Sequence, residues 1–167
     1  MLDVGNLALK PGDVRRLRVP VAIDPLQFGG ERYEVVADPE GADVELQAMV
    51  GGLYLKLRFE ATVAGPCYRC LEEASVTVKV SATEYQEQGA DPLDDELGCE
   101  YLDGDELDVD RWARDALVLA LPGKILCQPD CAGLCPRCGV RLEPGVDHDC
   151  APHETDSRWD ALRGLLE

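Results

Sequence analysis

Apolar residues fall mostly at every second position from Arg15 to Thr83, which is the period of a strand with one buried face. In the first run, Pro20 lies on the side opposite the apolar residues, which favours an edge strand because proline donates no ladder hydrogen bond. The apolar residues of that run are Leu17, Val19, Val21 and Ile23. A shorter strand is predicted from Tyr33 to Ala37. Segment 1–83 is therefore expected to form an antiparallel β region.

A tight hairpin is the clearest local signal in this region. Gly51 and Gly52 separate two alternating runs, and a two-residue glycine loop supplies the positive φ angles that such a turn needs. This turn would pair Val50 with Leu53, Ala48 with Leu55, Leu46 with Leu57, and Val44 with Phe59. A further run from Val76 to Ala82 can return beside residues 53–63. Cys67 and Cys70 then lie in the connection between two antiparallel strands.

Segment 84–107 differs in composition from the strands before it. Twelve acidic residues and no Lys or Arg lie between Glu84 and Asp110, which predicts a solvated acidic loop. A long loop of this kind is either functional or a plain spacer, and composition alone leaves both interpretations open.

Two helices are predicted after the acidic segment. Asp108 is a candidate N-cap for a helix over 108–122, which Pro122-Gly123 would end. Its apolar stripe consists of Val109, Trp112, Ala113, Ala116, Leu117 and Ala120. Ser157 and Asp160 resemble a capping box and predict a short closing helix. The stripe of that helix would be Trp159, Leu162, Leu165 and Leu166.

Charge and composition narrow the class of protein. The chain has 167 residues, 46% of them hydrophobic, and 16 basic against 33 acidic residues give a formal net charge of -17. This balance opposes non-specific attraction to nucleic-acid phosphates or anionic lipid. No apolar run reaches the roughly 18 residues of a membrane span, and the first residues lack the layout of a signal peptide. We therefore expect a cytoplasmic protein with no membrane partner and no direct non-specific nucleic-acid binding.

The chain has eight cysteines, and seven of them lie in two short regions. Lasting disulfides are uncommon in a reducing compartment, so metal thiolates explain them better. Cys135 and Cys138 have the spacing of a zinc knuckle, with a glycine following them. His148 and Cys150 would complete a tetrahedral site, with His153 as a spare ligand.

The remaining pairs, Cys67 with Cys70 and Cys127 with Cys131, also have structural-zinc spacing and would form a site of four thiolates. The alternative is a local site in which the second pair joins Cys135 and Cys138, leaving Cys67 and Cys70 as a free dithiol. We favour the long-range pairing, because it uses every clustered thiol and ties the sheet to the C-terminal segment. Two structural Zn²⁺ sites are therefore expected.

Cys99 lies apart from the clusters, within the acidic segment. We expect it to be dispensable and freely accessible, with a thiol pKa raised by Glu100 and neighbouring carboxylates.

The sequence gives little support for a catalytic site. The sequence has no phosphate loop or nucleophile elbow, and both proposed zinc sites are closed, whereas a catalytic zinc keeps an open position. The expected fold class is α+β, mainly antiparallel β-sheet or partly closed barrel with one longer and one short C-terminal helix and a zinc-knuckle appendage in segment 123–167.

The order of these motifs resembles the YceD family of large ribosomal RNA subunit accumulation proteins, over residues 67 to 162. The motifs are Cys67-Tyr-Arg-Cys-Leu71, Asp108 through Ala120-Leu-Pro122, Cys127 with Cys131, Gly133-Leu-Cys-Pro-Arg-Cys-Gly139 and Asp156-Ser-Arg-Trp159. Where the family typically continues with Asn-Leu-Asn and closes with Cys-x-Cys, this chain has Val140-Arg-Leu-Glu143 and His148-Asp-Cys150. Histidine can replace cysteine as a zinc ligand, which suits a mixed thiolate and imidazole site.

The resemblance implies a non-enzymatic factor in the accumulation or processing of large-subunit ribosomal RNA. We expect it to act through a basic large-subunit ribosomal protein or a ribosome assembly intermediate. The residues expected to contact that partner are Asp94, Asp95, Glu96, Asp103, Asp105 and Glu106. The alternatives are a zinc-ribbon nucleic-acid-binding or regulatory protein and a thiol oxidoreductase. The knuckle carries Arg137 and Arg141 against three acids, so no basic stripe favours the nucleic-acid alternative.

Overall fold

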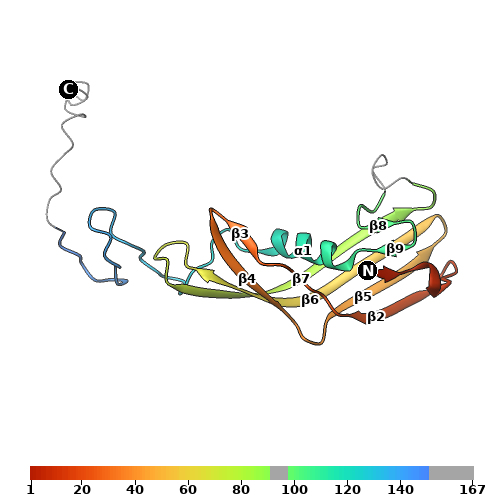
Figure 1. Ribbon diagram of the computed structural model, residues 1–167, viewed down its shortest axis with the longest axis horizontal. Coiled ribbons are helices and arrows are strands. Elements are labelled where there is room, and N and C mark those ends of the chain that lie inside the picture. Colours follow the sequence, from red (N-terminus) through yellow and green to blue (C-terminus); the bar gives the residue numbers. More distant parts are fainter. Residues whose placement is uncertain (91–97, 151–167) are drawn as a thin grey trace, which may run out of the picture.

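The computed structural model describes residues 1–90 and 98–150 as a mainly antiparallel sheet with one α-helix (Figure 1). The short elements are β1 (Leu2–Asp3), the 3-10 helix η1 (Gly5–Leu7), β8 (Leu102–Asp103) and β9 (Glu106–Leu107). The main strands are β2 (Val14–Val19), β3 (Leu26–Phe28), β4 (Glu31–Ala37), β5 (Ala42–Met49), β6 (Gly52–Pro66) and β7 (Glu73–Glu87). The helix α1 spans Val109–Ala120. The predicted closing helix lies outside the described residues.

Strand β6 organises the main sheet. It pairs with β7 along its whole length on one side, and on the other side with β5 and then with β4. Strands β2 and β3 extend the sheet beyond β5 and β4, and all pairs are antiparallel. The edge position of β2 confirms the prediction based on Pro20. Among the described residues, β2, β3 and β7 remain edges, so the structure has the expected antiparallel sheet and not the partly closed barrel that was its alternative.

The hairpin between β5 and β6 forms near the predicted position, but its register differs by two residues. Met49 pairs with Gly52 and Ala48 with Leu53, so the loop consists of Val50 and Gly51. Only Gly51 has a positive φ in this turn, at 125°. Gly52 is needed in the strand instead, because a Cβ there would collide with the backbone of Gln86 in β7. A shift of two residues leaves every side chain on its predicted face.

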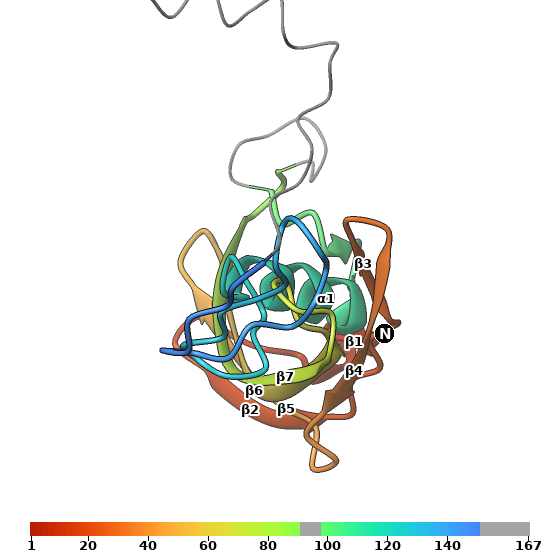
Figure 2. The ribbon, with the colours of Figure 1, turned by 90° about the vertical axis from the view of Figure 1, so that its left-hand side faces the viewer.

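The sheet curves around α1, which lies on its concave face (Figure 2). The concave side chains of β5 and β6 form the centre of the core, and most of them are at most 1% exposed. They include Val44, Leu46, Leu55, Leu57 and Val63. The helix contributes its predicted stripe except for Ala120, which is exposed at the end of the helix, and Trp112 and Leu117 are at most 1% exposed. Asp108 is the N-cap as predicted, and its side chain accepts a 3.0 Å hydrogen bond from the Arg111 amide.

The acidic segment 84–107 is less loop-like than predicted. Strand β7 continues to Glu87, and the small hairpin β8–β9 joins β1 in a second sheet. Cys99, Tyr101, Leu102 and Leu107 are buried in the core. These buried residues are few and lie among acidic residues, so the composition of the segment does not indicate that it packs into the core. Because Cys99 has no exposed surface, our expectation that it is freely accessible is wrong.

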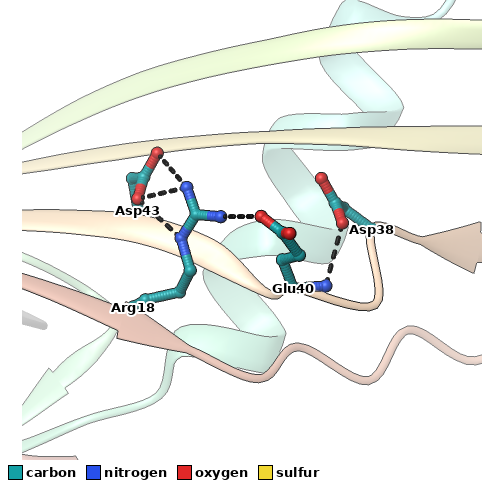
Figure 3. Close-up of polar contacts among 4 residues, drawn as sticks. All are labelled: Arg18, Asp38, Glu40 and Asp43. Atoms are coloured by element: carbon teal, nitrogen blue, oxygen red, sulfur yellow. Dashed lines mark hydrogen bonds and ion pairs between the residues drawn. The ribbon is translucent and has the colours of Figure 1, made fainter.

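An ion-pair network on the outer side of β2 and β5 fixes the edge of the sheet (Figure 3). The Arg18 guanidinium donates to both carboxylate oxygens of Asp43 and to Glu40 in the preceding turn, at 2.7–2.9 Å. The amide of Glu40 donates to Asp38, which closes that turn. These groups are exposed, so their main effect is on strand register rather than on the free energy of unfolding.

Candidate metal centres

The turn between β6 and β7 brings Cys67 and Cys70 to one end of the sheet. The backbone amide of Cys67 donates to the Glu72 carbonyl at 2.7 Å, and the Leu71 amide donates back to Cys67 at 3.0 Å. Leu71 takes a left-handed backbone with φ of 62° to complete this turn. The Arg69 amide points at the Cys67 sulfur, 3.5 Å away. This is the geometry of a knuckle that aims two thiols at a single ion.

The segment after α1 brings the second pair to this turn. The Tyr68 amide donates to the Ile125 carbonyl at 2.8 Å, which places Cys127 and Cys131 beside the turn. The Cys70 and Cys127 sulfurs are 3.5 Å apart, and those of Cys67 and Cys131 are 3.8 Å apart. The four ligand atoms lie within 4.8 Å of one another. We call these four residues the first centre.

The second centre consists of Cys135, Cys138, His148 and Cys150, whose ligand atoms also lie within 4.8 Å of one another. It repeats the local geometry of the first. The Arg137 amide points at the Cys135 sulfur at 3.4 Å, and the Cys138 sulfur lies 3.2 Å from Nε2 of His148. Cys138 and His148 are exposed, whereas three residues of the first centre are buried.

The thiol pKa values differ in the same way within both centres. Burial acts to raise the pKa of Cys67, but backbone hydrogen bonds, that of Arg69 foremost, lower it to about 6. The backbone amides of Cys138 and Arg137 lower the pKa of Cys135 to about 6. Burial and contact with Cys70 raise the pKa of Cys127 to about 12, while contact with Cys138 and burial raise that of Cys150 to about 11. Cys67 and Cys135 thus favour the thiolate, whereas Cys127 and Cys150 need a cation to offset the charge of their thiolates.

All eight predicted ligands fall into the two groups that the sequence favoured. The local alternative, which joins Cys127 and Cys131 to the Cys135 pair, is not the grouping observed. His148 takes the fourth position of the second centre, and His153 lies outside the described residues. No disulfide joins the cysteines within the described ranges.

Sequence reasoning missed three residues that support the centres. The Arg69 guanidinium donates to the Cys131 carbonyl at 2.6 Å, and Arg141 of the second knuckle reaches the Cys127 sulfur at 4.0 Å. Gly133 has a φ of 85°, and a Cβ there would lie 3.1 Å from the Arg69 carbonyl. The repeated Cys-x-Arg-Cys pattern at Arg69 and Arg137 was a usable signal for the first of these residues.

The predicted partner-binding acids are only partly within the described chain. Asp103, Asp105 and Glu106 are exposed on the β8–β9 hairpin, whereas Asp94, Asp95 and Glu96 lie outside the described residues. In Figure 1 this hairpin and the cysteine centres lie towards opposite ends of the long axis. Among the described helices, none is long and apolar enough to cross a membrane.

The fold and its cysteines define an antiparallel sheet protein with two four-ligand groups suited to metal ions. Residues 55–166 match the family described as large ribosomal RNA subunit accumulation protein YceD. The chain therefore belongs to the YceD family, which connects it coarsely with ribosomal RNA. The match confirms the resemblance drawn from its motifs and extends it into β6.

Three mycobacterial proteins are similar to this chain over nearly its whole length. It is 31% identical to an uncharacterized protein of Mycobacterium tuberculosis over 99% of this chain and 80% of that protein. The same values hold for an uncharacterized protein of Mycobacterium bovis. One of Mycobacterium leprae is 28% identical over 99% of this chain and 77% of that protein. No solved structure matches this chain.

Proposed function

We propose that this chain is a non-enzymatic factor that supports the accumulation or processing of large-subunit ribosomal RNA by binding a basic ribosomal protein. The observation that carries the proposal is the exposed β8–β9 hairpin, where Asp103, Asp105 and Glu106 lie within four residues in a chain of net charge -17 that belongs to the YceD family. Such a surface attracts a Lys- and Arg-rich partner at long range. Holding that partner until it meets its RNA would protect both components.

We further propose that Zn²⁺ fills both cysteine centres and has a structural role. Four thiolates, or three thiolates and an imidazole, are the ligand sets of structural zinc sites. Each centre offers four protein ligands, which is the number that a structural zinc site uses. Seven bound thiolates and two Zn²⁺ would take the formal charge of the chain to about -20, strengthening its attraction for a basic partner.

The partner contact can be tested by titrating the zinc-loaded full chain with candidate large-subunit ribosomal proteins at rising salt. The test variant replaces Asp94, Asp95, Glu96, Asp103, Asp105 and Glu106 by Asn or Gln. A matched control neutralises six exposed acids outside the acidic segment, namely Asp24, Glu31, Glu34, Glu72, Glu73 and Glu143. We expect the test variant to lose both affinity and salt dependence, because salt screens exposed charges over a Debye length that falls to roughly 3 Å at 1 M.

If both variants lost the same affinity, net charge alone would explain the binding. If the test variant bound as well as the unmodified chain, the acidic segment would be only a spacer. The position of the hairpin gives a second check. Because it lies away from the cysteine centres, removing metal from the second centre with Cys138→Ser should leave the affinity for the basic protein unchanged.

A further inference from the structure

The proposed function leaves the convex face of the sheet unused. No described element covers it, because α1 lies on the opposite, concave face (Figure 2). Strands β6 and β7 each have 15 residues and are the longest strands of this face. At about 3.4 Å per residue they give it a length of roughly 50 Å.

The convex side chains form cross-strand rows of known register. One row runs Arg16, Glu45, Lys56 and Thr83, and the next runs Arg18, Asp43, Arg58 and Ser81. Tyr54 faces Tyr85, and Glu60 faces Lys79, on β6 and β7. We call these residues the convex patch. It carries five cations against three carboxylates, although the chain as a whole has a net charge of -17.

Two of the three carboxylates of the convex patch, Glu45 and Asp43, are paired with its arginines, and Arg18 also binds Glu40 outside the patch. Arg16 donates to Glu45 at 2.6 Å, and Arg18 donates to Asp43 at 2.8 Å. The pKa of Glu45 is lowered mainly by the hydrogen bond from Arg16, and the charges of Arg58 and Lys56 add to this effect. Within residues 1–90 and 98–150, Lys56 and Arg58 have no ion pair, and Lys79 is 3.9 Å from Glu60 with its side chain 89% exposed.

A surface hollow of about 220 Å³ lies between these rows. Arg16, Lys56 and Arg58 contribute cations to its walls, together with Asp43 and Glu45. The β7 positions that pair with Lys56 and Arg58 carry the hydroxyls of Thr83 and Ser81 rather than large apolar groups. Free cations and hydroxyls next to a pair of tyrosines fit a sugar and phosphate backbone with bases that can stack.

We propose that the convex patch is a contact surface for single-stranded RNA. Lys56, Arg58 and Lys79 bind phosphates, and the paired Tyr54 and Tyr85 offer a surface for stacking. The net charge of the chain makes this contact weak and local rather than a general affinity for nucleic acid. Acidic residues more than a Debye length away, about 10 Å at 0.1 M salt, are largely screened. The contact is separate from the acidic hairpin, so a protein partner and an RNA can be held at once.

Fluorescence anisotropy of the zinc-loaded full chain with a labelled single-stranded RNA of about 16 nucleotides tests this proposal, with no ribosomal protein present. The test variant is Lys56→Gln with Arg58→Gln. The matched control is Lys10→Gln with Arg114→Gln, which removes the same charge from exposed positions outside the convex patch. We expect binding by the unmodified chain at about 50 mM salt, a loss of affinity of about tenfold in the test variant with a shallower salt slope, and little change in the control.

Three results would overturn the assignment. The first is that the unmodified chain fails to bind RNA at about 50 mM salt, and the second is that the control loses as much affinity for RNA as the test variant. The third is that poly-glutamate displaces the labelled RNA from the protein as well as unlabelled RNA does. The last result would identify the convex patch as a site for acidic protein. Zinc content and circular dichroism of both variants check that each has folded. Because no ribosomal protein is present in this assay, a negative result would contradict the RNA contact and would not bear on the proposed contact with a ribosomal protein.

Discussion

The guanidinium of Arg69 donates a 2.6 Å hydrogen bond to the backbone carbonyl of Cys131. Arg69 lies in the turn between β6 and β7, and Cys131 lies 62 residues further along the chain. The bond therefore joins the sheet to the C-terminal segment independently of any metal. It holds the two cysteine pairs of the first centre at ligand distance, so that a metal ion meets a preformed site.

Replacing Arg69 by Ala should weaken the first centre. A hydrogen bond of this type contributes about 1 kcal/mol, and its loss frees the Cys131 segment. We expect zinc to leave the first centre about fivefold faster and to leave the second centre at an unchanged rate, both measured with a chromogenic chelator. Arg137→Ala is the matched control, because Arg137 occupies the same place in the second knuckle and its side chain has no hydrogen bond within the described residues. Equal release rates in the two variants would contradict this role.

Gly133→Ala should damage the same junction through the backbone. Gly133 has a φ of 85°, and the new Cβ would lie 3.1 Å from the Arg69 carbonyl, so both strain and crowding oppose the alanine. We expect a loss of about 2 kcal/mol in the free energy of unfolding, measured by urea denaturation of the zinc-loaded protein. Gly139→Ala has a similar φ of 72° but open space around the Cβ, and should cost about half as much. Equal costs would show that the contact with Arg69 has no effect.

Cys99 gives a prediction about accessibility and pH. Burial, with the nearby charges of Glu84 and Glu100, raises the pKa of its thiol, so Cys99 should react slowly with a maleimide until the protein unfolds. A raised pKa means that the folded state holds the proton more tightly. The stability linked to Cys99 is therefore complete below the unfolded thiol pKa of about 8.5 and is lost as pH rises above it.

Substitutions at Cys99 test its role in packing. We expect Cys99→Ala to keep its full zinc content and to lose less stability at alkaline pH than the unmodified chain. Cys99→Ser should be less stable than Cys99→Ala by about 1 kcal/mol, because it buries a hydroxyl. Loss of zinc in the alanine variant, measured by elemental analysis, would place Cys99 among the ligands.

The cap of α1 is a fourth target. Asp108→Ala removes the acceptor for the Arg111 amide and should cost about 1 kcal/mol in the free energy of unfolding. Asp108→Asn keeps an acceptor and should recover most of that loss. Urea denaturation of both variants measures the difference. If the two variants were equally destabilised, the contribution of Asp108 would lie in its charge rather than in the hydrogen bond.

Periodicity and spacing were sufficient to predict much of this structure. The alternation in β6 and β7, the stripe of α1 with its Asp108 cap, and the eight clustered ligands are local patterns, and the structure contains each of them. The hairpin register was missed because the collision that keeps Gly52 in its strand comes from β7, which lies far along the sequence. The burial of Cys99 was missed because isolated apolar residues among acids have no period that would indicate a core.

The repeated Cys-x-Arg-Cys pattern marks Arg69 as a supporting residue, but the partners of the supporting residues lie beyond sequence reasoning. The bonds from Arg69 to Cys131 and from Arg141 to Cys127 join segments whose proximity exists only after the sheet and the metal ligands are placed. Likewise, the convex patch arises from cross-strand register, since Lys56 and Arg58 acquire their neighbours from β5 and β7.

The central claim is that the cysteines form two centres, one of which joins the sheet to the C-terminal segment. Elemental analysis of purified protein tests it most directly when combined with alkylation under native conditions. We predict two zinc ions per chain, one after Cys67→Ser with Cys70→Ser, and one after Cys138→Ser with Cys150→Ser, with Cys67 and Cys70 protected from alkylation in the unmodified protein. One zinc ion per unmodified chain, with Cys67 and Cys70 reacting rapidly, would contradict this account.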